Sequence, residues 1–559
     1  MCSPLAHAKQ KPTKMATIVV IGSGGRESCV ALTFAKSSKV AKVYVLPGNA
    51  GTQKSPNVKI ANLALESTSN ASYAKAVESV KADLVFVGPE APLVAGLVDD
   101  LNAKQIKCFG PTKLASELEA SKAFSKDFFS RHELPTASFQ TFSSPQEAKE
   151  YVNTKVDWKT SPVVVKASGL CAGKGVFIPN TAMEACEAIY AIMEDSKFGS
   201  DAGREIVIEE RLDGEEVSLL AFCDGETSKC MLPAQDHKRI GDGDLGLNTG
   251  GMGAYCPAPC VTPSLMKEME LVVQRTLTGL KQENTPFVGV LFAGFMLTKT
   301  GPKLLEYNVR MGDPETQVVL PLLESDLYDV CLACVEGRLK DTPVNFSTTL
   351  HAATVVMASL GYPETFPSGM EITFDEKEVP NVTVFHAGTK LSPDTGKVVA
   401  SGGRVLSVTG VGETLEKAVE TAYNGVKSVH FDQAYNRQDI AHRALKRRTI
   451  LDVVHASHRI TVHALQFLKL YLLSCFENGV KLPLVTEHLV VSIMNVLCEE
   501  SEHQETRGRR CNPATLTLKQ KLLEFHREHY KLTMTNPREK LGFTNKAQLL
   551  HRRGCGQGL

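Results

Sequence analysis

The chain has 559 residues, 43% of them apolar and 22% charged, a composition typical of a globular protein with room for about three or four domains. Lys plus Arg equals Asp plus Glu at 62 each, so no global charge argues for nucleic-acid or membrane partners. The absence of eighteen consecutive apolar residues excludes a transmembrane helix. The fifteen cysteines show neither paired CxxC motifs nor Cys/His finger spacing, which indicates reduced thiols. We therefore expect a cytosolic protein whose partners must be argued from its sites.

The N-terminal part of the chain alternates short β-branched runs with helix-length segments. Residues 1–14 are basic and polar without a signal-peptide core, so we expect a disordered extension, with Met15 as an alternative start. The alternation over residues 15–121 predicts a Rossmann-like, doubly wound parallel sheet. The loop from Gly22 to Glu27 lacks the third glycine of a dinucleotide fingerprint. We interpret it as a tight turn whose amides can meet an anion; a purely structural turn is the alternative.

The middle of the chain carries the pattern of a phosphate-binding lid. A helix opens after Ser121, a strand ends at Lys166, and a glycine-rich loop then precedes another apolar run. A Walker A motif is excluded because the glycine spacing is one short and no Ser or Thr follows Lys174. The pattern predicts a lid whose amides and lysines offset phosphate charge, with a plain glycine hairpin as the alternative. The candidate phosphate-binding residues here are Lys126, Lys166, Gly173, Lys174 and Gly175.

A strand that runs into a polar hinge follows the lid. Backbone groups of such a hinge can pair with an adenine edge, and a carboxylate a few residues later can accept both ribose hydroxyls. The candidates are Glu209, Glu210, Arg211 and Leu212 for adenine and Glu216 for ribose.

A later strand, residues 303–308, leads into a polar loop. Glu306 and Asn308 form a hard-oxygen pair suited to Mg²⁺, and Arg310 adds an anion-binding group. Simple alternation predicts two faces. We expect a chemical face of Leu304, Glu306, Asn308 and Arg310, and a core face of Leu305, Tyr307, Val309 and Met311. An edge strand with a solvated polar face is the alternative.

The order of these pieces resembles the ATP-grasp superfamily, and further motifs are similar to those of the phosphoribosylamine–glycine ligase (glycinamide ribonucleotide synthetase) family. The resemblance covers residues 15–448. Its motifs lie at residues 24–27, 47–51, 88–93, 235–239, 250–259, 312–315, 384–389 and 402–406.

The resemblance implies a fold, a reaction and roles for residues. It implies an ATP-grasp domain at residues 122–345 with a mobile lid at about 140–210, and a small α+β domain at 346–448. The family uses ATP and Mg²⁺ (or Mn²⁺) to join glycine to 5-phosphoribosylamine through glycyl phosphate. This reaction belongs to purine biosynthesis, so the resemblance also implies association with other enzymes of that pathway. The implied roles are metal binding for Glu306 and Asn308, approach to the phosphates for Arg239 and Asn248, and catalysis for Asp236, Arg310 and Asp313.

Two features depart from the family pattern. Ser28 stands where the family usually has His, which predicts the loss of a contact to phosphoribosylamine. The segment 289–294 offers no acid, leaving Glu306 as the one obvious carboxylate ligand. We interpret His237 and His386 as structural histidines.

The resemblance ends before residues 449–559. Apolar helix-length stretches at 462–476 and 484–497 predict a partly helical tail, either an interaction module or an unfolded read-through, whose partner the sequence does not name. Another ATP-grasp carboxylate–amine ligase, or an inactive nucleotide-binding scaffold that recruits partners through this tail, are the alternative functions. Retention of Lys166, Glu216, Glu306 and Asn308 favours an active enzyme.

Overall fold

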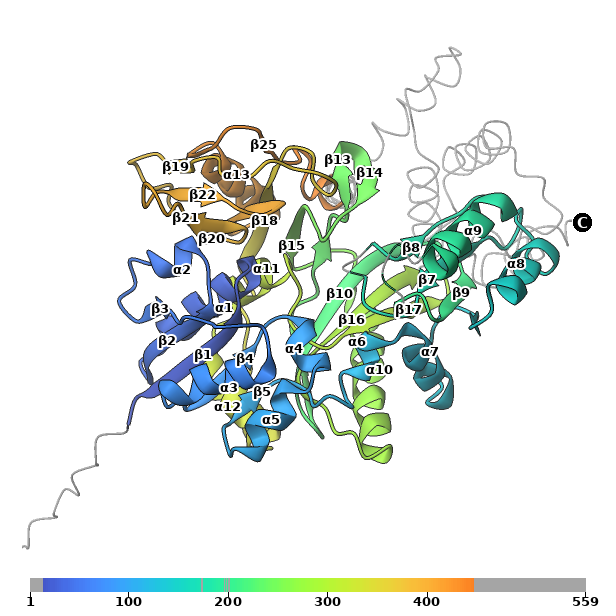
Figure 1. Ribbon diagram of the computed structural model, residues 1–559, viewed down its shortest axis with the longest axis horizontal. Coiled ribbons are helices and arrows are strands. Elements are labelled where there is room, and N and C mark those ends of the chain that lie inside the picture. Colours follow the sequence, from blue (N-terminus) through green and yellow to red (C-terminus); the bar gives the residue numbers. More distant parts are fainter. Residues whose placement is uncertain (1–13, 172–173, 196, 198, 200–201, 447–559) are drawn as a thin grey trace, which may run out of the picture. The chain divides into compact units, whose positions relative to one another are not determined.

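The computed structural model describes residues 14–171, 174–195, 197, 199 and 202–446 (Figure 1). The chain divides into one unit over Met1–Ala444 and another over Leu445–Leu559, and all described helices and strands belong to the first. The expected N-terminal extension, apart from Lys14, and the expected tail lie outside the described residues. None of the described helices is long and apolar enough to cross a membrane.

Five parallel strands form the N-terminal sheet, in the order β3-β2-β1-β4-β5 (blue in Figure 1). Alternate side chains of β1 enter different cores: Val19 and Ile21 pack on one face, and Ile18 and Val20 on the other. The sheet is therefore covered on both faces, as predicted. Its strands are β1 (Ala16–Gly22), β2 (Val40–Pro47), β3 (Ile60–Asn62), β4 (Leu84–Val87) and β5 (Cys108–Phe109). Its helices are α1 (Gly25–Lys36), α2 (Ala50–Gln53), α3 (Asn70–Ser79), α4 (Glu90–Val94), α5 (Leu97–Ala103) and α6 (Glu117–Ala120).

The central region contains a four-stranded antiparallel sheet in the order β11-β10-β16-β17. Leu219, Leu291 and Leu304 of this sheet share one core with Met269 and Leu277 of α10. The strand that carries Glu306 is the edge strand β17. The elements are β10 (Glu215–Asp224), β11 (Ser228–Cys230), β16 (Val288–Thr298), β17 (Gly301–Asn308), α7 (Lys122–Arg131) and α10 (Pro263–Gln282).

A β-bulge at Leu305 corrects the predicted faces of β17. Glu306 pairs with Gly294 but Leu304 pairs with the adjacent Phe295, so Leu305 is the extra residue. Leu304 consequently packs in the same core as Tyr307 and not beside Glu306. The bulge turns the Leu304 backbone outward from β16: its N–H donates to the Pro135 carbonyl at 2.7 Å, and its carbonyl accepts from Thr136 Oγ1 at 2.6 Å.

The lid is a second antiparallel sheet, in the order β6-β9-β7-β8, with its own core. Strands β7 and β8 flank the glycine-rich loop and pair with each other, so the loop joins two strands of a hairpin, as expected, and does not lead into a helix. Residues 211–214 connect the lid to β10. The elements are β6 (Phe139–Phe142), β7 (Val163–Ala167), β8 (Val176–Phe177), β9 (Ile206–Glu210), α8 (Pro145–Thr154) and α9 (Ala182–Ile189).

The C-terminal sheet has the order β12-β15-β18-β23-β20, with β25 paired to β18 (Figure 1). Its first two strands come from the middle of the chain, so residues 235–256 join the central region directly to the C-terminal sheet. The strands are β12 (Gln235–Asp236), β15 (Gly253–Cys256), β18 (His351–Ser359), β20 (Val382–His386), β23 (Arg404–Gly412) and β25 (Ala434–Tyr435), with helix α13 (Leu415–Val426) packed on them. The remaining elements are β13 (Arg239–Gly241), β14 (Leu245–Asn248), β19 (Thr373–Phe374), β21 (Thr389–Leu391), β22 (Val398–Ala400), β24 (Val429–His430), α11 (Thr316–Val319) and α12 (Leu327–Val335).

Candidate active site

Two lysines from different elements meet one carboxylate where the lid approaches the central sheet. Lys166 Nζ, at the end of β7, lies 2.5 Å from Glu209 Oε1, and Lys126 Nζ, on α7, lies 2.5 Å from Glu209 Oε2. Burial raises the pKa of Glu209, but the two lysines outweigh it and hold the pKa below its ordinary value. The structure thus brings together both predicted lysines and one predicted hinge residue. The Glu209 backbone is paired on both sides, to Phe139 and Val164.

Glu306 projects from β17 into a strongly positive environment. Burial alone would raise its pKa, but Lys122, Lys166, Lys238 and Arg310 outweigh burial and lower the pKa to about 2. Among the described residues no hydrogen bond or ion pair engages its carboxylate. Glu306 is therefore an ionised carboxylate with free oxygen lone pairs.

Asn308 lies two residues further along the same strand face. Their regular pairing, Glu306 with Gly294 and Asn308 with Phe292, keeps both side chains on one side of the sheet. Asn308 Oδ1 lies 3.3 Å from Arg310 Nη2, which makes it a hydrogen-bond acceptor. The predicted oxygen pair is therefore assembled at the sheet edge.

The Arg310 guanidinium is already held by the protein. Its Nη2 donates to Glu119 Oε1 at 2.9 Å and its Nε to Glu90 Oε2 at 3.3 Å. The sequence prediction named neither carboxylate, because both lie in the N-terminal domain about two hundred positions away from Arg310. Glu90 stands in the family motif at residues 88–93, and this was the available signal.

A second acidic group surrounds Lys238. Lys238 forms an ion pair with Glu216, the predicted ribose ligand. Burial, opposed by Lys238 and reinforced by Glu315 and Glu216, raises the pKa of Asp236 to about 7. Lys238 was missed by the sequence analysis, although it lies two residues from Asp236 and strand alternation would have placed both on one face.

Asp313 is fixed at the end of the same loop. Gln317 Nε2 donates to its Oδ1 at 2.7 Å, and Arg404 Nη2 lies 3.4 Å from its Oδ2. Arg404 Nη1 also donates to the Gly250 carbonyl at 2.7 Å, which ties the 250–259 motif to this corner. Arg404, from the 402–406 motif, is a further residue that sequence reasoning did not assign.

Other predicted residues lie apart from this cluster. Arg239 and Asn248 face each other in the hairpin of β13 and β14, where Arg239 Nη1 donates to the Gly246 carbonyl at 2.7 Å. Lys174 Nζ donates to the Pro363 carbonyl at 3.3 Å. The rest are placed as follows: the Gly175 carbonyl accepts from Ala167 N–H, Glu210 Oε2 accepts from Ser138, Arg211 donates to Asn180, Leu212 is half-buried in the 211–214 connection, and Gly173 lies outside the described residues.

Ser28 is buried between the first helix and the C-terminal sheet. It is 3% exposed, donates through Oγ to the His386 carbonyl at 2.7 Å and accepts from Asn49 Nδ2 at 2.9 Å. In the preceding loop, Gly24 N–H donates to Glu27 Oε2 at 2.7 Å, so this amide already has an anionic partner within the protein. Ser28 therefore packs the first helix onto the C-terminal sheet.

Comparisons with known proteins decide the family. Models of the phosphoribosylglycinamide synthetase N domain, ATP-grasp (A) domain and C domain match residues 16–119, 120–316 and 352–443. The chain belongs to the phosphoribosylglycinamide synthetase family. This result confirms the resemblance drawn from the motifs.

Individual relatives agree with this family. A phosphoribosylamine–glycine ligase of Chlorobaculum tepidum is 46% identical over 431 residues, which cover 77% of this chain and 100% of the relative. The trifunctional purine biosynthetic protein adenosine-3 of Gallus gallus is 50% identical over 77% of this chain, but the chain spans only 42% of its length. A crystal structure of a phosphoribosylamine–glycine ligase from Thermotoga maritima matches with a TM-score of 0.66 and 33% identity, over 76% of this chain and 99% of that one.

The donor set of this synthetase-family chain fits a hard divalent cation. Glu306 is ionised without a protein partner in the described part of the chain, and Asn308 offers an amide oxygen on the same face. Mg²⁺ prefers such oxygen ligands and fills its other positions with water or phosphate. The surrounding lysines suit the phosphate oxygens that such an ion would bring.

A second cluster, His237, Asp244 and His442, brings three possible ligand atoms within 4.8 Å of one another but does not fit a metal. His237 Nε2 accepts the Ala441 N–H at 2.9 Å, so its proton is on Nδ1, which faces Asp244 Oδ1 at 3.5 Å. Arg437 Nη1 also forms an ion pair with Asp244 Oδ1, at 2.9 Å. The ion pairs of this cluster hold the β13–β14 hairpin against residues 437–443, which supports the structural interpretation of His237.

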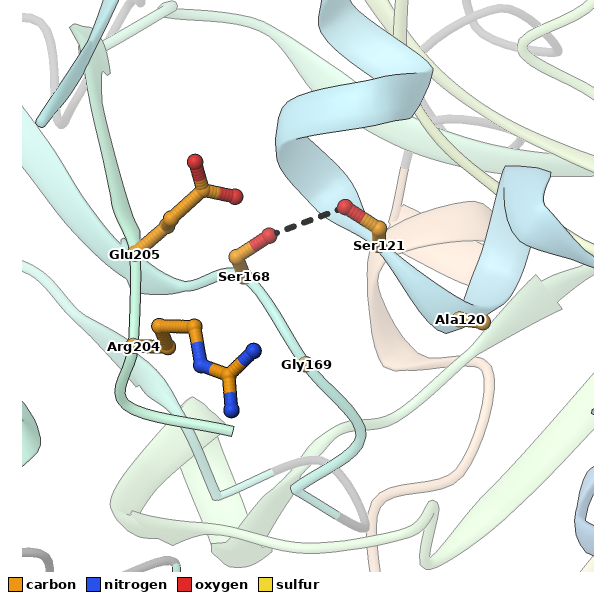
Figure 2. Close-up of a pocket in the computed structure, with 6 residues that line it drawn as sticks. All are labelled: Ala120, Ser121, Ser168, Gly169, Arg204 and Glu205. Carbon is orange, nitrogen blue, oxygen red and sulfur yellow. Dashed lines mark hydrogen bonds between the residues drawn. The ribbon is translucent and has the colours of Figure 1, made fainter. Parts of the chain in front are cut away.

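A small pocket of about 180 Å³ lies at the base of the glycine-rich loop (Figure 2). Ser121 and Ser168 hydrogen bond across it at 3.2 Å, and Ser168 also accepts the Ala123 N–H at 3.1 Å. The loop is thus anchored to the start of α7. The pocket is lined by Ala120, Ser121, Ser168, Gly169, Arg204 and Glu205.

Proposed function

We propose that this protein joins glycine to 5-phosphoribosylamine at the expense of ATP, giving 5-phosphoribosylglycinamide, ADP and phosphate in purine biosynthesis. The observation that carries the proposal is the ionised Glu306 on the sheet edge, which has no partner in the described part of the chain. It stands beside Asn308, among cationic side chains of α7, the lid and the 235–239 segment. Family membership supplies the substrates, since a relative that the chain covers completely is named phosphoribosylamine–glycine ligase.

The first step places charge on the glycine carboxylate and on the transferring phosphoryl group. Glu306 and Asn308 would hold Mg²⁺ or Mn²⁺, which neutralises charge on the terminal phosphates when bound. Lys126 and Lys166 stand beside this position and would exchange part of their contact with Glu209 for phosphate oxygens. The phosphoryl group passes to a glycine carboxylate oxygen, and ADP leaves.

The second step needs a shielded acyl phosphate and a positioned amine. The amine of phosphoribosylamine attacks the glycyl carbonyl carbon, forms the amide and expels phosphate. We assign the exclusion of water during this step to the glycine-rich hairpin, with Lys174 and Gly175. Exclusion of water matters because hydrolysis of the acyl phosphate would waste ATP.

The acidic group beside Lys238 suits an ammonium ligand. Burial and the like charges of Glu315 and Glu216 raise the pKa of Asp236. A cation placed beside Asp236 would offset these effects and stabilise its ionised carboxylate. We assign the glycine ammonium to Asp236. Arg310 and Asp313 are both already ion-paired within the protein. We therefore assign them the orientation of glycine only through the donor and acceptor atoms that these pairs leave unused.

The nucleotide base belongs at the connection between lid and sheet. Strand β9 ends at Glu210, Arg211 and Leu212 begin the connection, and Glu216 stands at the start of β10. We assign adenine to the backbone of this connection and the ribose to Glu216, which would release Lys238 toward the phosphates. Arg239 and Asn248 sit on one hairpin, and we assign them to the outer rim of the phosphate site.

A steady-state assay tests the proposal. Purified protein with Mg²⁺ and ATP should release ADP and phosphate only when glycine and phosphoribosylamine are both present, and other acid and amine pairs should give little release. Release with a different pair would assign another carboxylate–amine ligase. Nucleotide binding without release would instead support a scaffold. Association with other purine-synthesis enzymes is a further proposal, which rests on the multifunctional names of the relatives.

A further inference from the structure

Glu119, at the end of α6, makes two contacts with the segment that follows the metal-binding residues. Its Oε2 accepts the Val309 backbone N–H at 2.7 Å, and its Oε1 accepts from Arg310 Nη2 at 2.9 Å. Glu119 is only 7% exposed, so both bonds form away from bulk water. Val309 directly follows Asn308, where β17 ends. One buried carboxylate therefore fixes both the backbone and the side chain next to Asn308.

Arg310 carries this constraint to the metal-binding amide. The same Nη2 that Glu119 holds lies 3.3 Å from Asn308 Oδ1. A guanidinium can only donate, so this contact fixes which amide atom is the oxygen and occupies one of its two acceptor positions. The other acceptor position of Oδ1 is left for a cation. Glu90 Oε2 steadies the opposite edge of Arg310 at 3.3 Å.

We propose that Glu119 is a positioning residue for the divalent cation, acting through Val309 and Arg310 on Asn308 Oδ1. This inference rests on the proposed function, because it takes Glu306 and Asn308 as the metal ligands. Mg²⁺ tolerates little distortion of its coordination geometry, so a displaced amide oxygen weakens binding. The N-terminal domain thereby completes a metal site whose ligands all lie on the central sheet.

The test measures metal binding directly, without turnover. Mn²⁺ is titrated into the full-length protein at saturating ADP, and free Mn²⁺ is followed by electron paramagnetic resonance. Glu119→Gln keeps the shape of the side chain but removes its charge, and we expect Mn²⁺ affinity to fall about 10–100-fold, the usual cost of losing a partner of a metal ligand. Glu119→Asp keeps the charge but reaches only one of the two donors, and should show a smaller loss. Glu117→Gln, on the same helix, is the matched control and should bind like the wild type.

A kinetic comparison separates positioning from general support of the fold. In Glu119→Gln the Mg²⁺ concentration that gives half-maximal activity should rise by the same factor, while the KM for phosphoribosylamine changes less than about twofold. Unchanged Mn²⁺ affinity in a folded Glu119→Gln or Glu119→Asp protein would overturn the inference, as would an equal rise in every KM. A wild type that binds Mn²⁺ and ADP but never ligates glycine would disprove the proposed reaction alone. Absence of Mn²⁺ binding in the wild type would disprove the metal role itself.

Discussion

Lys166 and Glu209 form a buried ion pair in which Nζ lies 2.5 Å from Oε1. Glu209 also forms an ion pair with Lys126 through Oε2, and all three side chains are less than 10% exposed. A single carboxylate therefore compensates two ammonium groups that a bound triphosphate would also attract. Removing the carboxylate leaves both ammonium groups buried without this ion pair, which is among the most costly single changes in a protein.

We therefore expect Glu209→Gln to reduce the free energy of unfolding by about 3–5 kcal/mol. The measurement is urea unfolding followed by circular dichroism. Saturating ATP should raise the Tm of the variant more than that of the wild type, because phosphates replace the missing anion. Glu66→Gln, which removes the exposed ion pair with Lys75, is the control and should unfold like the wild type. An equally stable Glu209→Gln protein would show that the lysines do not depend on this carboxylate.

Glu306→Ala tests the metal site. Glu306 is the one predicted anionic ligand, and loss of a key electrostatic group in an active site costs at least about a hundredfold in kcat. We expect turnover to fall by that factor or more at ordinary Mg²⁺, with an unchanged far-ultraviolet circular dichroism spectrum. Glu324→Ala, at an exposed position later in the chain, should keep full activity. Near-normal turnover in Glu306→Ala would refute the assignment of the site.

The sequence predicted the fold well because its signals are local. Alternating runs indicated the parallel sheet, and the apolar run after the glycine-rich loop indicated a hairpin where a Walker A motif would need a helix. The bulge at Leu305 was not predictable in this way. It depends on the backbone of Leu304 bonding to Pro135 and Thr136, residues about 170 positions earlier in the chain.

The candidate site was predicted in part, for the same reason. Glu306 and Asn308 share a face because two residues separate neighbours on one side of a strand, and this spacing is visible in the sequence. Glu119 carries no such signal, since its partner Val309 is 190 positions away and the contact exists only in the folded chain. The expectation that Ser28 costs a contact to phosphoribosylamine stays a prediction, because a family difference indicates a changed position but not the direction of its side chain.

Ser28→His tests the packing of this position. The position is nearly fully buried and its hydroxyl bonds to Asn49 and to the His386 carbonyl, so an imidazole must displace its neighbours. We expect a loss of about 1–3 kcal/mol in the free energy of unfolding, as for other overpacked interiors. Ser28→Ala should lose about 1 kcal/mol through its hydrogen bonds. Tighter use of phosphoribosylamine by Ser28→His, without a loss of stability, would instead place this residue at the substrate.

His237 gives the protein a specific sensitivity to acid. It is fully buried, and its Nε2 accepts the Ala441 N–H, so protonation would break that bond beside Arg437 and Arg443. Burial lowers its pKa from 6.5 to about 4, with Asp244 opposing and the two arginines reinforcing the shift. The folded state therefore favours neutral His237. The resulting stabilisation is complete above pH 6.5 and is lost as the pH falls toward 4.

We expect this residue alone to cost about 2 kcal/mol of stability between pH 7.5 and pH 5, since each pKa unit corresponds to about 1.4 kcal/mol. In His237→Gln the side-chain oxygen can still accept the Ala441 N–H but cannot take up a proton. The variant should therefore lose less stability than the wild type over that interval, measured by urea unfolding at both pH values. His430→Gln changes a mostly exposed histidine and should keep the wild-type dependence. If His237→Gln also follows the wild-type curve, the acid sensitivity arises elsewhere, because the contribution of His237 would then be the same in both folded and unfolded states.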